Sequence, residues 1–354
     1  MHEKVLAQRA KLSSRLSVFA ATAIAFLASP LFAEPRPPEK QAIVEAFGFK
    51  QLGLQIGSLQ VTYYLKDCED SDRSRLFLFL QGSDPGPQFL WRNASGAPRP
   101  LTVIPSDHEQ LGDHDCYVVV EKAGMEGVFE EPVSAIPQSY HDANSLDDRV
   151  ARANAVIDQL QEARSFSQVI VYGHSEGAPV AAKLASQNEH ITHLGFWAGS
   201  VLGDFYDFTI QTRSLVHRGE ASSSEAQRSI DEAISHFADE VVANPNDTWV
   251  DDFGYTNQRW MSYSEPPLYH LLSIDIPVFM QVATDDESAP IDSTYIVPLE
   301  FSRLGKSNLS YRVCYGCDHG FRVTSETGEE IGKWPEIFGD MLKWLDASAG
   351  KPSG

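Results

Sequence analysis

Short apolar runs that alternate with amphipathic segments constrain the fold of this chain most strongly. Residues 76–80 read LFLFL, and residues 117–120 and 169–172 are equally apolar. Such runs are typical of strands that are buried on both faces of a sheet. Further strands are predicted at residues 59–65, 195–197, 277–282 and 311–314.

Helical periodicity occupies the intervals between several of these strands. Residues 145–164 place apolar side chains at helical spacing, and Ser145 precedes them as the expected N-cap. Residues 179–186 and 334–345 are also predicted to be helices. Strands that alternate with helices predict an α/β fold, in which a mostly parallel sheet is covered by helices on both faces.

One long segment interrupts this alternation. Residues 202–275 contain helical stretches, about 224–243 among them, and many aromatic residues. An insertion of this length in a compact domain predicts a helical cap or lid rather than a loop. The core of the α/β fold is therefore expected to comprise residues 34–201 and 276–348.

Composition narrows the classes of partner. Apolar residues make up 42% of the 354 residues, which excludes a disordered chain. The formal net charge is −21, and so acidic a chain repels nucleic acid and anionic lipid. We therefore expect no nucleic-acid partner and no binding to an anionic membrane surface. None of these features determines an oligomeric state.

The N-terminus has the pattern of a signal peptide. Basic residues precede an apolar run at residues 16–27, which is short for a membrane span, and the small residue Ala33 precedes an expected cut before Glu34. An uncleaved anchor is the alternative interpretation. Removal of residues 1–33 leaves no long apolar run, so we expect an exported protein, periplasmic or secreted, without a membrane segment.

Export changes the interpretation of the four cysteines. An even number in an oxidising compartment favours two disulfides, and Cys68, Cys116, Cys314 and Cys317 allow three pairings. Cys314 and Cys317 form a C-x-x-C motif after a predicted strand, where a structural disulfide is favoured over a redox centre.

No cofactor or metal is expected. The cysteines lack the second ligand pair that zinc requires, and no dinucleotide or EF-hand motif is present. His190 and His193 have no third ligand nearby, so we expect both at the surface.

The most specific chemical signal is Gly173-His174-Ser175-Glu176-Gly177, directly after the predicted strand 169–172 and before a helix. A serine on so sharp a turn holds its hydroxyl clear of the backbone, and the flanking glycines leave room for the turn. This context favours a nucleophile elbow over a purely structural turn.

At these residues the chain resembles the α/β-hydrolase superfamily over most of residues 55–347. The resemblance implies an α/β-hydrolase fold and a triad in the chain order serine, acid, histidine. Of the eleven histidines, only His319 lies after the fifth strand of the elbow-bearing sheet, residues 277–282. It follows the last predicted strand, as the catalytic histidine of the family does.

The acid of the triad should follow strand 277–282. Residues 283–290, ATDDESAP, resemble the family pattern Gly-x-x-Asp-x-x-Val-Pro, which selects Asp286. Asp285 is the second choice because the alanines that replace Gly and Val weaken the register. Asp204 is a third, more remote choice.

The resemblance also implies where the oxyanion hole lies. One donor should be the N–H of Glu176 and the other the N–H of Ser83, in the loop after strand 76–80. The side chain of Glu176 has two interpretations: a carboxylate that favours the start of a helix, or a contact with a cationic group of the substrate.

The disulfide pairing follows from the resemblance as well. In the family the second strand lies beside the fourth, so Cys68 should pair with Cys116 and Cys314 with Cys317. The second bridge would then stiffen the loop that carries His319.

Together these features predict an exported serine hydrolase that cleaves carboxylic esters, and the expected partner is a small-molecule or acyl substrate. Peptidase or acyl-transferase activity with the same triad is an alternative. A binding protein that kept the fold and lost catalysis is another, and the presence of Ser175, Asp286 and His319 argues against it.

Overall fold

The computed structural model describes residues 39–68, 74–92, 98–252 and 254–348. The expected signal peptide, residues 1–33, lies outside the described residues. Within these ranges no helix combines the length and apolar composition that a membrane span requires.

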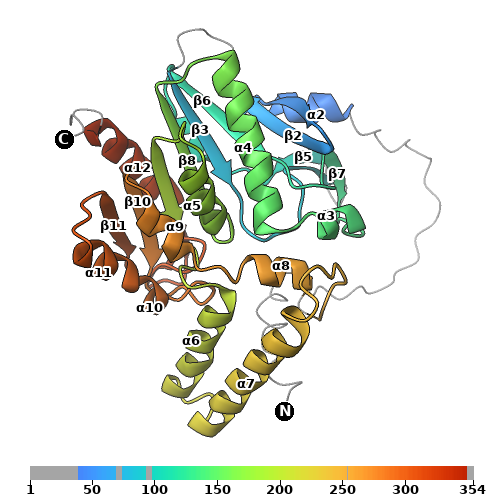
Figure 1. Cartoon of the computed structure of the whole chain (residues 1–354). Coiled ribbons are helices and arrows are strands. Elements are labelled where there is room, and N and C mark those ends of the chain that lie inside the picture. Colours follow the sequence, from blue (N-terminus) through green and yellow to red (C-terminus); the bar gives the residue numbers. More distant parts are fainter. Residues whose placement is uncertain (1–38, 69–73, 93–97, 253, 349–354) are drawn as a thin grey trace. The chain divides into compact units, whose positions relative to one another are not determined.

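An eight-stranded sheet forms the centre of the described part of the chain (Figure 1). Its strand order is β1-β2-β6-β3-β8-β9-β10-β11. β2 runs antiparallel to both of its neighbours, and the pairs from β6 to β11 are parallel. The strands are β1 (Lys50–Ile56), β2 (Leu59–Lys66), β3 (Arg75–Leu80), β6 (Asp115–Val120), β8 (Gln168–His174), β9 (His193–Trp197), β10 (Val278–Ala283) and β11 (Leu309–Cys314).

The apolar strands are buried on both faces, as predicted. Alternate side chains of β3 enter two different cores: Leu76 and Leu78 lie in one, Phe77 and Phe79 in the other. The first core is mainly aliphatic and the second is rich in aromatic rings. This division follows from the two-residue period of a strand.

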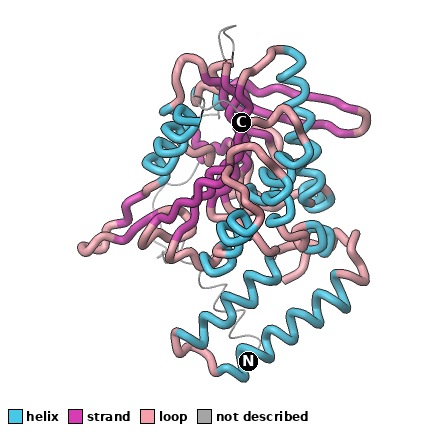
Figure 2. Tube along the Cα trace, turned by 60° about the vertical axis from the view of Figure 1, so that its left-hand side comes forward, coloured by secondary structure: helices cyan, strands magenta, loops and turns pink. Residues whose placement is uncertain are grey.

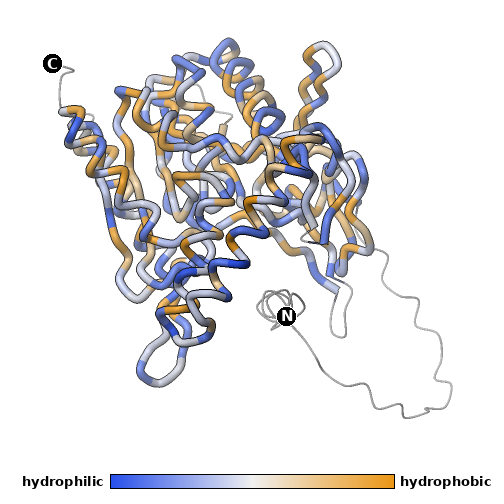
Figure 3. The backbone as a smooth tube through the Cα atoms, turned by 60° about the horizontal axis from the view of Figure 1, so that its bottom comes forward, coloured by the Kyte–Doolittle hydropathy of each residue, from blue (hydrophilic) through white to orange (hydrophobic). Residues whose placement is uncertain are grey.

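Helices cover both faces of the sheet (Figure 2). Side chains of four helices enter the aliphatic core: α4 (Leu146–Ala163), α5 (Gly177–Gln187), α9 (Pro267–Ser273) and α11 (Ile296–Arg303). Two others enter the aromatic core: α2 (Lys40–Ala46) and α12 (Trp334–Ser348). Blue and orange alternate along α12, the helix that leads to the C-terminus in Figure 3, as expected for an amphipathic segment.

The start of α4 confirms the predicted cap. Ser145 Oγ accepts a hydrogen bond from the Asp148 N–H at 3.1 Å. Val150 and Ile157 then face the sheet and are buried. Arg149 lies on the same face and is buried too, which the apolar periodicity did not predict.

Several short elements have no counterpart in the prediction. Besides β1, they are a three-stranded sheet of β4 (Phe89–Arg92), β5 (Arg99–Thr102) and β7 (Val128–Glu131), the hairpin β12 (Arg322–Thr324) and β13 (Glu330–Gly332), and the short helices η1 (Ser106–Gln110), α3 (Gln138–Asp142) and α10 (Ile291–Thr294). Each is too short, or too exposed, for the periodicity to be distinctive.

The segment 202–275 is helical, with α6 (Asp204–His217), α7 (Ser223–His236), the π-helical turn η2 (Phe237–Val241), α8 (Asn257–Ser262) and α9. α6 and α7 pack on each other and extend from the sheet in Figure 1. Phe205 packs against Phe237 and Trp260, with ring centroids 4.6 and 5.2 Å away. α9 instead packs against α5, and Leu271 is fully buried in the aliphatic core.

His193 departs from the prediction that it lies at the surface. It is the first residue of β9 and is 7% exposed, with its ring edge-on to Trp344. Burial lowers the pKa of His193 to about 4. The prediction for this residue was wrong because its sequence neighbours could not indicate that α12 covers it.

Candidate active site

Ser175 lies on the turn between β8 and α5. Its φ angle is 56°, in the left-handed region that side chains rarely adopt, and its N–H donates to the Trp197 carbonyl at 3.0 Å. A Cβ added at Gly173 would lie 2.0 Å from the Gly177 oxygen, and one added at Gly177 would lie 1.9 Å from the Leu80 oxygen. The turn therefore requires both glycines, which accounts for the G-x-S-x-G spacing.

Asp286 and His319 are hydrogen bonded. The Nδ1 of His319 is 2.9 Å from each carboxylate oxygen of Asp286, whose side chain is 1% exposed. The Oδ1 atom of Asp286 also accepts the N–H groups of Ser288 and Ala289, both at 2.8 Å. These contacts orient the carboxylate. Asp286 binds the Nδ1 side of the imidazole, so Nε2 is the ring nitrogen that could exchange a proton with Ser175.

The other two acids considered point elsewhere. Asp285 is exposed and accepts a hydrogen bond from the Thr284 hydroxyl at 2.9 Å. Asp204 is the first residue of α6 and pairs with Arg259 at 2.9 Å. Of the three, the structure brings Asp286 to His319.

His174 links the elbow to the loop that carries His319. Its Nε2–H donates to the His319 carbonyl at 2.8 Å, and the two ring centroids are 4.9 Å apart. The rings of Trp334 and Phe321 also contact His174. Burial lowers the pKa of His174 to about 3, so this ring is neutral and its donor is constant across the physiological range.

The loop after β3, residues 81–86, lies against the elbow. A Cβ added at Gly82 would lie 3.1 Å from Ser175 Cβ and 3.5 Å from its Oγ. Ser83 is the next residue, so the structure brings its backbone to the neighbourhood of the serine. The residues predicted for the site thus gather at the carboxyl ends of β3, β8, β10 and β11.

No protein-family model and no curated protein sequence matches the chain. Several solved structures are similar to the chain. Acylaminoacyl peptidase from Pyrococcus horikoshii aligns with 86% of this chain and 42% of its own, at 11% identity and a TM-score of 0.52. A puromycin-hydrolyzing peptidase from Mycobacterium tuberculosis aligns with 84% of this chain and 38% of its own, at 13% identity and a TM-score of 0.50.

Est1E from Butyrivibrio proteoclasticus aligns with 84% of this chain and 99% of its own, at 11% identity and a TM-score of 0.48. The chain spans about two fifths of the length of the two peptidases. Acylaminoacyl peptidase is an α/β-hydrolase superfamily member. The chain has the α/β-hydrolase fold.

In this α/β-hydrolase fold, the side chain of Glu176 makes contacts that neither sequence interpretation predicted. Its side chain is 4% exposed and lies between two arginines, with Arg149 Nη1 at 2.8 Å and Arg259 Nε at 2.9 Å. Burial alone would raise the pKa of Glu176, but the guanidinium groups of Arg259 and Arg149 outweigh it and lower the pKa to about 2. The carboxylate is therefore charged, with both of its oxygens engaged by protein groups.

The same ion-pair cluster connects parts of the α/β-hydrolase fold that are distant in sequence. Glu176 precedes α5, Arg149 belongs to α4 and Arg259 to α8, in the segment 202–275. The guanidinium group of Arg259 also lies over the rings of Tyr255 and Tyr263, at 3.8 and 4.9 Å. The residue that follows the serine thus links α8, in the segment 202–275, to α4 and to the start of α5.

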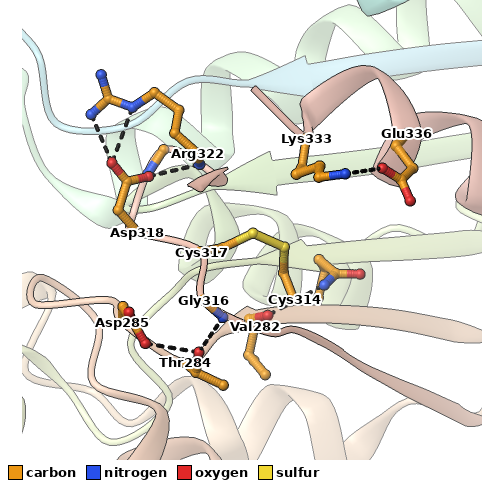
Figure 4. Close-up of a disulfide and its surroundings, with 12 residues drawn as sticks. Val282, Thr284, Asp285, Cys314, Gly316, Cys317, Asp318, Arg322, Lys333 and Glu336 are labelled. Carbon is orange, nitrogen blue, oxygen red and sulfur yellow. Dashed lines mark hydrogen bonds and ion pairs between the residues drawn. A yellow bond between two sulfur atoms is a disulfide. The ribbon is translucent and has the colours of Figure 1, made fainter. Parts of the chain in front are cut away.

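Both expected disulfides are present. Cys68 and Cys116 join the end of β2 to β6 with Cα atoms 4.7 Å apart, and Cys314 and Cys317 are bonded with Cα atoms 5.5 Å apart. Figure 4 shows the second bridge between the end of β11 and the chain leading to Asp318. The N–H of Gly316, inside the bridged turn, donates to the Thr284 hydroxyl at 2.7 Å. The bridged turn, at the start of the His319 loop, is thus hydrogen bonded to the loop that carries Asp286.

Four residues around the site were not singled out from the sequence: Lys122, Arg149, His174 and Arg259. Arg149 did carry a signal, because a charged residue on the apolar face of a predicted helix must have a buried partner. Lys122 carried another, because it follows a wholly apolar strand at the edge where the site forms.

The part of the chain that the structure describes contains no group of three or more His, Cys, Asp or Glu side chains placed to hold a metal ion.

Proposed function

We propose that the chain is an exported serine hydrolase that cleaves carboxylic esters. The observation that carries the proposal is Ser175 on a strained strand-to-helix turn, at the same sheet edge as the hydrogen-bonded pair of Asp286 and His319. A positive φ at a non-glycine residue stores strain that persists only where the surrounding structure requires it, and such residues cluster at functional sites.

The mechanism follows from the residue types. His319 removes the proton of the Ser175 hydroxyl as the oxygen attacks the ester carbonyl. Asp286 accepts the Nδ1–H of His319, holds the ring in the required tautomer and stabilises its cation. The imidazolium then protonates the leaving alcohol, and an acyl-enzyme remains. Water, activated by the same imidazole, hydrolyses that acyl-enzyme and releases the acid.

The oxyanion of each tetrahedral intermediate requires backbone donors. We assign the N–H of Glu176 and the N–H of Ser83 to this role. The first follows the serine, and the second belongs to the loop whose Gly82 lies against Ser175. A donor of this kind is typically worth about 2.7–4 kcal/mol in the transition state.

Export rests on two observations. Residues 1–33 have the n-region, apolar run and small residue of a signal peptide. Both pairs of cysteines in the described residues form disulfides, which persist in oxidising compartments.

Amide cleavage is the second candidate. Two solved proteins of the same fold, at TM-scores of 0.52 and 0.50, are peptidases. The chemistry of Ser175, His319 and Asp286 serves either substrate, since only the leaving group differs.

A fluorophosphonate probe tests the proposal. Wild-type protein should be labelled at one serine, Ser175→Ala should not be labelled, and Ser186→Ala, a change on α5, should be labelled as the wild type is. Turnover should fall by about 10⁴–10⁶-fold in Ser175→Ala. An aryl ester and an aminoacyl amide with the same acyl group then distinguish esterase from peptidase. Absence of labelling in the wild type would favour a binding protein of the same fold.

A further inference from the structure

A buried lysine holds the backbone of loop 81–86. Lys122 follows β6 by two residues and is 4% exposed. Its Nζ donates to the carbonyl oxygen of Gly82 at 2.6 Å and to that of Asp84 at 2.5 Å. An ammonium group makes stronger hydrogen bonds to carbonyl oxygens than a neutral donor does.

Arg149 acts on the preceding peptide. Its Nη2 donates to the carbonyl oxygen of Gln81, while its Nη1 binds the Glu176 carboxylate. Two consecutive carbonyl groups of the loop, those of Gln81 and Gly82, are therefore directed at buried cations.

The direction of these carbonyls determines the direction of the N–H groups. In a trans peptide the C=O and the N–H point to opposite sides. Because the Gly82 carbonyl faces Lys122, the N–H of Ser83 in the same peptide points away from Lys122. Gly82 itself contacts the serine, since a Cβ there would lie 3.1 Å from Ser175 Cβ. The contact with Lys122 thus sets the orientation of a peptide that touches the elbow.

We propose, on the basis of the proposed serine hydrolase, that Lys122 is a positioning residue for the oxyanion hole. Its ammonium holds the Gly82–Ser83 peptide so that the Ser83 N–H donates to the oxyanion formed at Ser175. Lys122 does not touch the substrate and acts through this peptide alone. Its charge also polarises the peptide, which strengthens the N–H as a donor.

The charge of Lys122 is sensitive to pH. Burial lowers the pKa of Lys122 to about 7. The ammonium is therefore present below that pH and lost above it. Arg149 lowers the pKa of Lys122 further, whereas Glu176, Asp84 and Glu121 raise it; the Tyr140 ring lies 6.0 Å from Nζ. Burial raises the pKa of Glu121 to about 8, so this carboxyl gains its charge over the pH range in which Lys122 loses its own.

Lys122→Met tests the proposal, because it keeps most of the length of the side chain and removes the donors. Loss of one oxyanion donor lowers kcat by about 10²–10³-fold, and a donor that is present but misoriented should lose about 10–100-fold. KM for the ester should stay within about threefold, because the oxyanion exists only in the transition state. Lys183→Met, which removes a largely buried lysine paired with Glu265, is the matched control and should leave kcat unchanged.

Rates are measured per active site, by fluorophosphonate titration, at pH 6 and at pH 9. The ratio of wild-type to Lys122→Met kcat should be larger at pH 6, where Lys122 is charged, than at pH 9. Taking the ratio removes any pH dependence that both proteins share. A ratio below about two at pH 6, or a ratio independent of pH, would overturn the proposal.

Lys122→Gln keeps a shorter neutral donor and should have an intermediate kcat. If neither Lys122 variant folds, the proposal is also overturned, because the residue is then required for stability rather than for orientation. A wild type that neither reacts with the probe nor hydrolyses esters contradicts the proposed function. A reactive wild type with an unaffected Lys122→Met contradicts this inference alone.

Discussion

Replacing Glu176 with glutamine should destabilise the fold strongly, although the two side chains have nearly the same shape. Glu176 is 4% exposed, and its two oxygens face Arg149 and Arg259, which are 7% and 4% exposed. The variant removes the carboxylate that pairs with Arg149 and leaves Arg259 with Asp204 alone. Removing one partner from such a buried ion pair typically costs about 3–5 kcal/mol.

The pKa of Glu176 leads to a similar magnitude. The two arginines lower it from an ordinary 4.5 to about 2. One pKa unit equals about 1.4 kcal/mol, so the charged carboxylate stabilises the folded state by ~3 kcal/mol at neutral pH. A lowered pKa gives stability that is complete above the unfolded value of about 4.5 and is lost as the pH falls towards 2. The difference between wild type and variant should therefore be constant from pH 5 to 7 and shrink below pH 4.5.

Urea denaturation followed by tryptophan fluorescence at pH 7, 5 and 3 measures this difference. Glu265→Gln is the matched control, because Glu265 also joins the segment 202–275 to α5, through Lys183 at 2.7 Å. Its side chain is 41% exposed, so its removal should cost no more than about 1 kcal/mol. The reasoning is refuted if the unfolding free energy of Glu176→Gln lies within 1 kcal/mol of that of this control. It is also refuted if the difference in unfolding free energy between wild type and Glu176→Gln is the same at pH 3 as at pH 7.

Two further predictions concern the acid of the proposed triad and the longer disulfide. Asp286→Asn should lower kcat by about 10⁴-fold with an unchanged circular dichroism spectrum, because His319 loses the acceptor that orients it. Asp285→Asn should lower kcat less than about tenfold, since an exposed carboxylate contributes only a screened field; a deeper loss in Asp285→Asn would shift the assignment by one residue. Replacing Cys68 and Cys116 together by serine should lower the unfolding free energy by ~4 kcal/mol. The bridge joins residues that are 48 positions apart and so restricts the unfolded chain. Urea denaturation measures that loss, and an unchanged midpoint would contradict it.

Much of the sheet could be predicted from the chain alone. The run 76–80 is apolar at every position because both faces of β3 are buried. The helix α4 was predicted because its cap and its apolar spacing are local properties of consecutive residues. The short strands β4, β5 and β7 were not predicted, because each is only four residues long and depends on pairing partners elsewhere.

The position of Ser175 could be predicted for a steric reason that is local. Gly173 and Gly177 are required because any Cβ would collide with backbone atoms of the turn or of β3. His319 and Asp286 were selected by their order along the chain and by resemblance, and the structure brings the two together. Their catalytic roles stay predictions until the variants are measured.

The cluster around Glu176 could not be derived from the sequence. Glu176 is 27 residues from Arg149 and 83 residues from Arg259, and no periodic pattern connects them. From the sequence, a carboxylate after the serine was interpreted first as favouring a helix start and second as a contact for a cationic substrate group.

The sequence by itself therefore determined the features that depend on neighbours along the chain, namely buried strands, helix caps and the glycines of the elbow. What only the tertiary structure decided was the pairing of charges. Lys122, Arg149 and Glu176 are buried, and burial of a charge is tolerated only where a partner meets it at hydrogen-bond distance. That partner is set by how the sheet, α4 and the segment 202–275 pack, and packing is a property of the whole folded chain.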